Sequence, residues 1–268
     1  MADLYQPPAS FQNRALIKDM DAYQEMYARS IEDPEAFWAD IASGFHWFKP
    51  WDSVCSYNYD INEGPIYIKW FEGGKTNIVY NCLDRHLGSC GDQNAIVWEG
   101  NDPSDDTHIT YRELHEQVCK FANVLKARGV KKGDRVSIYM PMIPELAVAM
   151  LACARIGAVH SIVFGGFSAD SLADRIVDSE CRIVLTTNGT HRGDKPLFMK
   201  PVADQAITEA EKQMDVTVDT CIVVERVKND PEFQFDMVEG RDFWWHDLVA
   251  DASVDCPCEE MDAEDLLF

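Results

Sequence analysis

The chain has 268 residues, of which 46% are hydrophobic and 11% aromatic, and its formal net charge is −22. These proportions are typical of a globular protein, and the length allows one large domain or two modest ones. The strong negative charge argues against binding to nucleic acid or to an anionic membrane surface. No apolar run approaches the ~18 residues of a membrane-spanning helix, and the start lacks the features of a secretory signal.

The nine cysteines are scattered through predicted helices and strands, and their odd number does not fit a closed disulfide framework. We therefore expect reduced thiols and a cytoplasmic location. Cys256 and Cys258 are separated by a single residue, which is closer than a usual pair of zinc ligands. The sequence has neither a set of residues with metal-ligand spacing nor a nucleophile–base pair, so it predicts no metal site and no catalytic residue in this chain.

Residues 1–93 form an aromatic-rich region in which strands and helices do not alternate regularly. A helix is expected over residues 20–42, with an interruption at Asp33 and Pro34. Asp33 is suited to cap the second helical segment, and proline is well tolerated at the first helical position. Residues 66–71 have the composition of a strand. The many aromatic side chains of this region indicate packing, not a ligand site.

From residue 94 onward, strands and helices alternate. A short strand pair, 95–99 and 108–110, precedes a helix whose first turn carries the capping box Thr110-x-x-Glu113. Further strands are expected at residues 135–140, 159–163, 182–186 and 220–224, with helices at 141–156, 168–178 and 201–213. This alternation predicts an α/β fold in which a parallel sheet is covered by helices.

In such a sheet, ligands bind at the carboxyl ends of strands, and one candidate turn is Phe164-Gly165-Gly166. The two glycines allow the backbone to approach a ligand closely, and the helix that follows directs its N–H groups toward the same point. The stretch is not a complete phosphate-binding or dinucleotide-binding motif. A tight turn without a ligand is therefore the alternative interpretation.

A second candidate turn, Arg192-Gly193-Asp194-Lys195, follows the next strand. Two cations flanking a glycine suit an anionic ligand, and Arg192 can grip a phosphate with two parallel hydrogen bonds. The local positive charge is informative because residues 201–268 carry 19 acidic residues against 4 basic ones. Ordinary exposed basic side chains in a loop are the alternative interpretation here.

Several stretches, in the same order along the chain, resemble acetyl-CoA synthetases. The matching stretches are His46 to Trp51, Gly73 to His86, Asp134 to Met142, Ala152 to Ala158 and Phe164 to Ser168. The resemblance extends from about residue 20 to the last residue. Because it rests on many ordered matches, it is far more specific than either candidate turn alone.

The resemblance implies an adenylate-forming ligase. In this family, acetate and ATP, accompanied by magnesium, give acetyl-adenylate and pyrophosphate, and the CoA thiol then takes the acetyl group and releases AMP. The resemblance also implies that residues 1–93 are the N-terminal region of such an enzyme and that residues 94–268 are the first part of its AMP-binding domain.

The same resemblance implies a role for the two candidate turns. The residues that it assigns to the CoA site are Phe164, Gly165, Gly166, Arg192, Gly193, Asp194 and Lys195. Many members of the family have a second arginine at the position of Lys195. Lysine keeps the charge but lacks the forked geometry of a guanidinium, so we expect a weaker contact with phosphate at this position.

In the family, a Thr/Ser/Gly-rich loop that binds the ATP phosphates follows soon after the segment matching residues 262–268. The sequence therefore predicts a chain truncated before that loop, inactive alone, with the remainder of the polypeptide as its partner. Three alternatives stay open: the same portion of a propionyl-CoA or other short-chain synthetase, a non-catalytic CoA-binding or interaction module, and a structural fragment whose sheet has an open edge after residue 224.

Overall fold

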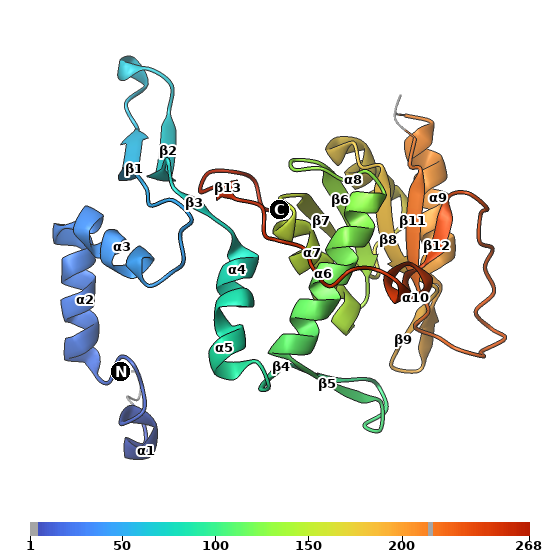
Figure 1. Cartoon of the computed structure of the whole chain (residues 1–268), viewed down its shortest axis with the longest axis horizontal. Coiled ribbons are helices and arrows are strands. Elements are labelled where there is room, and N and C mark those ends of the chain that lie inside the picture. Colours follow the sequence, from blue (N-terminus) through green and yellow to red (C-terminus); the bar gives the residue numbers. More distant parts are fainter. Residues whose placement is uncertain (1–4, 214–216) are drawn as a thin grey trace. The chain divides into compact units, whose positions relative to one another are not determined.

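The computed structural model describes residues 5–213 and 217–268. It divides the chain into two compact units, Met1–Gly74 and Lys75–Phe268, whose elements are labelled in Figure 1. The first four residues, which bear on the expected absence of a secretory signal, lie outside the described residues. The division between an N-terminal region and an AMP-binding domain after residue 93 stays a prediction.

The smaller unit combines short helices with one hairpin. Its elements are α1 (Ala9–Gln12), α2 (Met20–Glu32), α3 (Pro34–Ser43), β1 (Ser53–Asn58), η1 (Ile61–Glu63) and β2 (Tyr67–Glu72), and β1 pairs with β2 in antiparallel fashion. The predicted interruption of the long helix is confirmed, because the carboxylate of Asp33 accepts a hydrogen bond of 3.0 Å from the N–H of Ala36. Trp47 packs against Trp51 and Phe71, with ring centroids 4.9 and 5.4 Å apart.

The larger unit is built around a five-stranded sheet with the order β12-β11-β8-β6-β7. Every neighbouring pair in this sheet is parallel. The strands are β6 (Arg135–Met140), β7 (Val159–Phe164), β8 (Ile183–Thr187), β11 (Thr220–Val224) and β12 (Asp242–Trp244). The parallel sheet confirms the α/β fold expected from the alternation of strands and helices.

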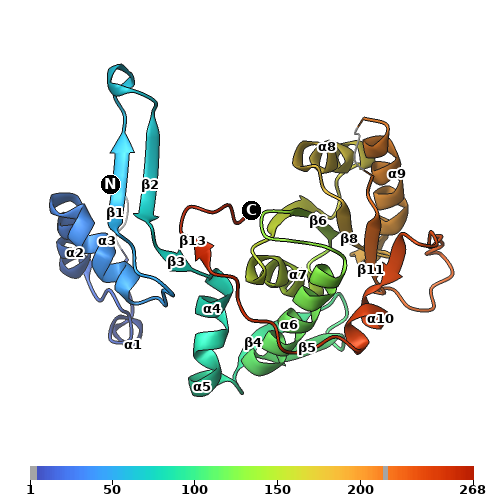
Figure 2. The same cartoon turned by 45° about the horizontal axis from the view of Figure 1, so that its top comes forward.

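Helices cover both faces of the sheet (Figure 2). One face is covered by α6 (Tyr111–Ala127), α7 (Pro144–Arg155) and α10 (Trp245–Ala250), and the other by α8 (Ala169–Ser179) and α9 (Met199–Glu211). The side chains of β6 alternate accordingly: Val136 and Ile138 pack toward α6 and α7, whereas Tyr139 packs toward α8 and α9. Within the described part of the chain, no helix is long and apolar enough to cross a bilayer.

Short elements complete the larger unit. They are β3 (Lys75–Thr76), α4 (Ile78–Cys82), η2 (Asp84–His86), α5 (Leu87–Cys90), β4 (Asn94–Glu99), β5 (Asp106–Thr110), β9 (Thr190–Arg192), β10 (Lys195–Leu197) and β13 (Met261–Asp262). The predicted capping box is present at the start of α6, where Thr110 and Glu113 each satisfy the other's backbone N–H.

The order of the strands reverses at β6. The chain passes from β6 through α7 to β7 on one side, then returns through α8 to β8 on the other side and continues outward to β11 and β12. The helix after β6 is α7 and the next helix after β8 is α9, and these two helices lie on opposite faces of the sheet. A crevice is therefore expected between the carboxyl ends of β6 and β8. The topology thus indicates where a ligand site should lie.

The structural-fragment alternative placed an open sheet edge directly after residue 224, and the structure contradicts that edge. β12 pairs in parallel with β11, and Asp242 lies opposite Cys221. The sequence did not indicate this strand, because it is short and begins with a charged residue. That charge is compensated in the fold: the Nζ atom of Lys200 lies 2.7 Å from Oδ2 of Asp242, and neither side chain is exposed.

The buried ion pair between Lys200 and Asp242 belongs to a network that joins α9 to β12. Lys200 also binds both carboxylate oxygens of Asp204 at 2.7 Å, and the Nε atom of Arg241 lies 2.6 Å from Oδ1 of Asp242. Burial alone would raise the pKa of Asp242, but the hydrogen bonds from Arg241 and Lys200 hold it below its usual range. Asp242 is therefore charged, and its charge depends on these partners.

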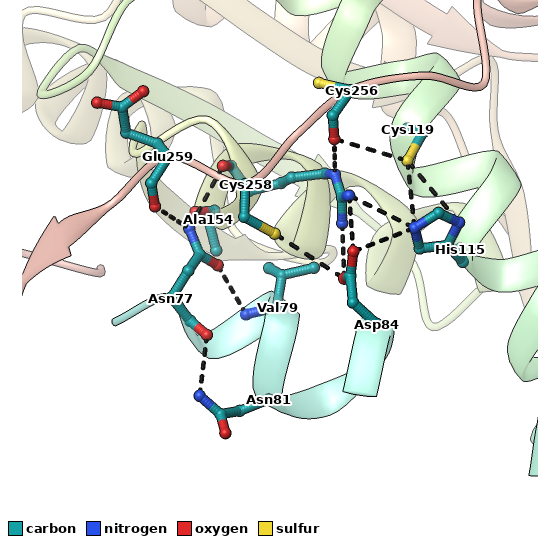
Figure 3. A network of polar contacts seen from close by, with 11 residues as sticks. Asn77, Val79, Asn81, Asp84, His115, Cys119, Ala154, Cys256, Cys258 and Glu259 are labelled. Carbon is teal, nitrogen blue, oxygen red and sulfur yellow. Dashed lines mark hydrogen bonds and ion pairs between the residues drawn. The ribbon is translucent and has the colours of Figure 1, made fainter. Parts of the chain in front are cut away.

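A second network holds residues 256–259 against the helices (Figure 3). The guanidinium of Arg155, which is only 3% exposed, donates to both oxygens of Asp84 at 2.9 Å and to the carbonyl oxygen of Cys256. The Nε2 atom of His115 lies 3.2 Å from Oδ1 of Asp84, which is one of the two oxygens that Arg155 contacts. The amide of Asn77 donates to the carbonyl oxygen of Glu259 at 2.9 Å.

The charges of this second network stabilise one another. The hydrogen bond to Asp84, with a further contribution from Cys119, raises the pKa of His115 to about 9. Burial opposes ionisation of Asp84, yet the hydrogen bonds from His115 and Arg155 hold its pKa well below its usual range. At neutral pH one carboxylate therefore lies between two cations, which stabilises the folded chain.

We expect that replacing Lys200 with Met lowers the free energy of unfolding by about 3 kcal/mol, because it leaves a buried carboxylate with one partner fewer. The matched control is Lys212→Met, since Lys212 lies just beyond the same helix in an exposed pair with Glu209. The control should cost less than about 1 kcal/mol. Urea unfolding measures both, and equal midpoints for the two variants would contradict the role of the network.

We expect that His115→Gln destabilises the chain in a pH-dependent manner. The folded pKa of His115, about 9, lies above its unfolded value, so the stabilisation is complete below about pH 6.5 and is lost as the pH rises through the folded pKa. The difference in the free energy of unfolding from the parent chain should be largest, up to about 2 kcal/mol, below about pH 6.5 and should disappear above about pH 9.

The control for His115→Gln is Asn123→Ala. The amide of Asn123 donates to the carbonyl oxygens of Ser253 and Asp255 at 2.9 and 3.0 Å, so it attaches the neighbouring part of the same segment without a titrating group. Its cost should not vary with pH over the same interval. A cost of His115→Gln that is equally constant would show that the charge of His115 does not contribute.

Candidate functional site

A pocket lies at the carboxyl edge of the sheet, where the strand order reverses. Its volume is about 750 Å³, and most of its lining comes from five segments of the larger unit: 98–105, 140–143, 162–165, 190–193 and 226–230. Four of these segments include or follow the ends of β6, β7, β8 and β11, and the fifth belongs to the β4–β5 hairpin. The crevice implied by the topology is therefore present as a cavity of ligand size.

The pocket brings the two candidate turns together. Phe164 and Gly165 line it from the end of β7, and Arg192 and Gly193 line it from the β9–β10 hairpin. The Cζ atom of Arg192 lies 6.0 Å from the centroid of the Phe164 ring. The other three candidate residues, Gly166, Asp194 and Lys195, lie outside the set of described residues that line the pocket.

The glycines of the two turns are required for different reasons. A Cβ atom on Gly165 would lie 3.0 Å from the carbonyl oxygen of Met140, so a side chain at this position would require the neighbouring backbone to shift. Gly193 has open space around it, but its φ of +59° is a left-handed conformation that favours glycine. The first glycine permits close packing of the backbone, and the second permits the turn of the hairpin.

The β9–β10 hairpin presents two cations at its tip. In the antiparallel register of the hairpin, Lys195 lies opposite Arg192, and only two residues connect them. In the part of the chain that the structure describes, neither side chain forms a hydrogen bond or an ion pair with another residue. Both charges are therefore available to an anionic ligand.

Asn188 joins the segment after β8 to the segment after β11, a role that the sequence alone did not indicate. Its side chain is almost fully buried, and its Oδ1 atom accepts hydrogen bonds from the N–H groups of Gly189, Arg226 and Val227 at 3.0, 2.9 and 3.1 Å. Its Nδ2 atom donates to the carbonyl oxygen of Val227 at 2.6 Å. The only local signal was an Asn-Gly pair at a strand end, which is typical of any turn.

The β4–β5 hairpin forms a wall of the pocket that the sequence also did not indicate. The guanidinium of Arg226 lies 2.6 Å from Oδ2 of Asp105 and 5.0 Å from the ring centroid of Trp98. The amide of Asn101 donates to the carbonyl oxygen of His191 at 3.1 Å. These contacts attach the hairpin to the turns that carry the cations, and they join residues too distant in sequence for any local pattern to reveal.

The Asp84–His115–Cys119 cluster has the residue types of a nucleophile–base–acid triad, but its environment does not suit catalysis. Cys119 is fully buried, and its sulfur lies 3.7 Å from Nε2 of His115. The raised pKa of His115 keeps the imidazole protonated at neutral pH, so it is not available as a base. In the described residues, no group of three or more His, Cys, Asp or Glu side chains is placed to hold a metal ion.

Comparison with known families assigns both parts of the chain. The profile described as "AMP-binding enzyme" matches residues 83–268, and the profile described as "Acetyl-coenzyme A synthetase N-terminus" matches residues 23–82. The acetyl-coenzyme A synthetase of Magnetococcus marinus is 57% identical over 255 residues, which are 95% of this chain and 37% of that protein. That of Drosophila melanogaster is 49% identical over an alignment of 276 positions, which covers 99% of this chain and 41% of that protein.

A solved structure gives the same result for the fold. Acetoacetyl-CoA synthetase from Streptomyces lividans superposes with a TM-score of 0.82 at 23% sequence identity, covering 98% of this chain and 40% of that protein. This similarity supports the fold alone, and the chain spans well under half the length of all three relatives. The matched profiles show that the chain belongs to the family of AMP-binding enzymes, in which its sequence corresponds to the N-terminal part of acetyl-CoA synthetases.

Proposed function

We propose that the chain supplies the CoA-binding site of an AMP-forming acetate–CoA ligase. The observation that carries this proposal is that the Phe164–Gly165 turn and Arg192 line one pocket, although they belong to different turns of the sequence. The resemblance to acetyl-CoA synthetases implies a CoA contact for both turns independently of their position in the fold. Their convergence at the reversal of strand order supports a shared ligand.

The lining of the pocket supports a ligand with two chemically different parts. Apolar side chains form much of the surface between the turns: Met140, Met142, Ile143, Leu146, Ile162, Val163 and Leu197. Arg192 adds a cation that has no ion-pair partner among the described residues. CoA combines a long, largely uncharged pantetheine chain with a phosphorylated nucleotide, so it matches a pocket whose lining combines many apolar side chains with an unpaired cation.

In the proposed reaction, acetate attacks ATP to give acetyl-adenylate and pyrophosphate, and the thiol of CoA displaces AMP from the adenylate. Acetate as the acid is taken from the relatives that are named acetyl-coenzyme A synthetase. Magnesium is proposed only as the companion of ATP, because the described residues offer no ligand set for a metal ion. A cytoplasmic location is also proposed, and it is supported by nine cysteines that are all free thiols within the described residues.

We expect that Arg192→Ala weakens CoA binding by about 10-fold to 100-fold, because it removes a charge-assisted contact with phosphate. Calorimetric titration of the 268-residue chain with CoA measures the affinity. The matched control is Arg182→Ala, since Arg182 precedes β8 at the opposite end of that strand and its side chain is 67% exposed.

The control variant should bind CoA like the parent chain. Circular dichroism should confirm that all three proteins are folded before the titrations are compared. Folded parent chain that does not bind CoA, or equal affinities for the Arg192 and Arg182 variants, would overturn the proposed function.

A further inference from the structure

We propose that the segment Arg226–Lys228, which follows β11, forms a second cationic turn of the pocket and holds the diphosphate of CoA. This inference rests on the proposed function, and it adds a contact that the sequence did not assign. The turn that carries Arg192 is then left to the 3′-phosphate of the same ligand. Lys228 is the proposed phosphate contact, and Arg226 is a positioning residue.

The two cationic turns leave the sheet side by side. β8 and β11 are neighbouring parallel strands, and their last residues, Thr187 and Val224, lie opposite each other. The hairpin with Arg192 follows β8, and the segment with Lys228 follows β11. Both segments line the same cavity, so their cations surround one ligand.

The backbone of the second turn is fixed by a buried group. The Oδ1 atom of Asn188 accepts the N–H groups of Arg226 and Val227, and its Nδ2 atom binds the carbonyl oxygen of Val227. These hydrogen bonds are internal to the chain and do not need a ligand to form. The segment is therefore held in place before binding, which reduces the entropy cost of association.

The side chains of the second turn have separate tasks. Arg226 is held by the carboxylate of Asp105 and lies over the ring of Trp98, so much of its charge is balanced. Lys228 is exposed and lines the cavity, and within the described residues its Nζ atom has no acidic partner. Lys228 is thus the cation that this turn offers to an incoming anion.

The acidic residues of the pocket are mostly engaged. Of the four carboxylates that line it, Asp105 is paired with Arg226, Asp102 accepts hydrogen bonds from Ser104, and Asp230 lies 3.9 Å from Nε2 of His191. Glu99 is the fourth. Arg192 and Lys228, by contrast, have no acidic partner among the described residues, so both cations remain available to an anionic ligand.

Two separate cationic turns match a ligand that carries two separate anionic groups. CoA has a phosphate on the 3′ oxygen of its ribose and a diphosphate on the 5′ oxygen. The 3′-phosphate is a monoester and carries about −1.5 to −2 charges at neutral pH. The diphosphate is also anionic, so a cation near each of the two positions favours binding. In this proposal the turn with Lys228 contacts the diphosphate on the 5′ oxygen, and the turn with Arg192 contacts the phosphate on the 3′ oxygen.

The experiment compares CoA with 3′-dephospho-CoA, which keeps the diphosphate and lacks the 3′-phosphate. Lys228→Ala should weaken the binding of both ligands by about fivefold, because it removes a contact with a group that both carry. Arg192→Ala should weaken CoA far more than 3′-dephospho-CoA. Lys228→Arg should restore the affinity, and Lys212→Ala, an exposed lysine outside the pocket, should change neither ligand.

Each alternative result has a distinct meaning. If Lys228→Ala binds both ligands like Lys212→Ala while Arg192→Ala weakens CoA, the second cationic turn is wrong and the proposed function stands. If Lys228→Ala weakens CoA alone, the segment contacts the 3′-phosphate and the diphosphate assignment is wrong. If the folded parent chain binds neither ligand, both proposals fail together.

Discussion

The parallel register of the central strands is the constraint on which the candidate site depends. Met140 lies opposite Phe164 at the ends of β6 and β7, and Thr187 lies opposite Val224 at the ends of β8 and β11. Because all four strands end at one edge, the segments that follow them line one cavity. A slip of one residue in any pair would turn the side chains of that strand to the other face of the sheet, and the turns would no longer meet in this arrangement.

Register alone would leave the connecting segments free, and buried polar groups fix them. The amide of Asn188 binds three N–H groups and one carbonyl oxygen of the two segments that it joins. Any one of these backbone groups left unpaired in the interior would cost about 1–3 kcal/mol. The two cationic segments are thus positioned by the folding energy of the chain, not by the ligand.

Local patterns predicted the parts of the fold that local interactions specify. The strands at 135–140 and 220–224 have the predicted bounds, because their apolar residues mark buried strands between clear turns. The β9–β10 hairpin and β12 were not predicted, since each of these strands has only three residues. β12 also depends on pairing with β11, which lies about 20 residues earlier. Arg155 lies in the helix predicted at residues 141–156, but its partner Asp84 lies 71 residues earlier, beyond any local pattern.

In the candidate site, too, local sequence patterns predicted some residues, whereas others depend on contacts between distant parts of the chain. The glycine-rich turn after β7 and the cations around Gly193 can be recognised in the sequence, because glycines or paired basic residues at a strand end indicate an anion-binding turn. Trp98, Asp105, Asn188 and Arg226 are not visible in this way. Arg226 and Asp105 are 121 residues apart in the sequence, and Arg226 and Asn188 are 38 residues apart. Their hydrogen bonds form only when the sheet assembles, so no local pattern predicts them.

The net charge of the chain and the charge of its pocket act over different distances. At physiological ionic strength, interactions between exposed charges are screened over about 8 Å, so distant acids contribute little to what a ligand experiences inside the cavity. The local arrangement decides instead: Asp105 is neutralised by Arg226, whereas Arg192 has no acidic partner among the described residues. An acidic protein can therefore still present individual unpaired cations to an anionic ligand, as Arg192 and Lys228 do among the residues that line this pocket.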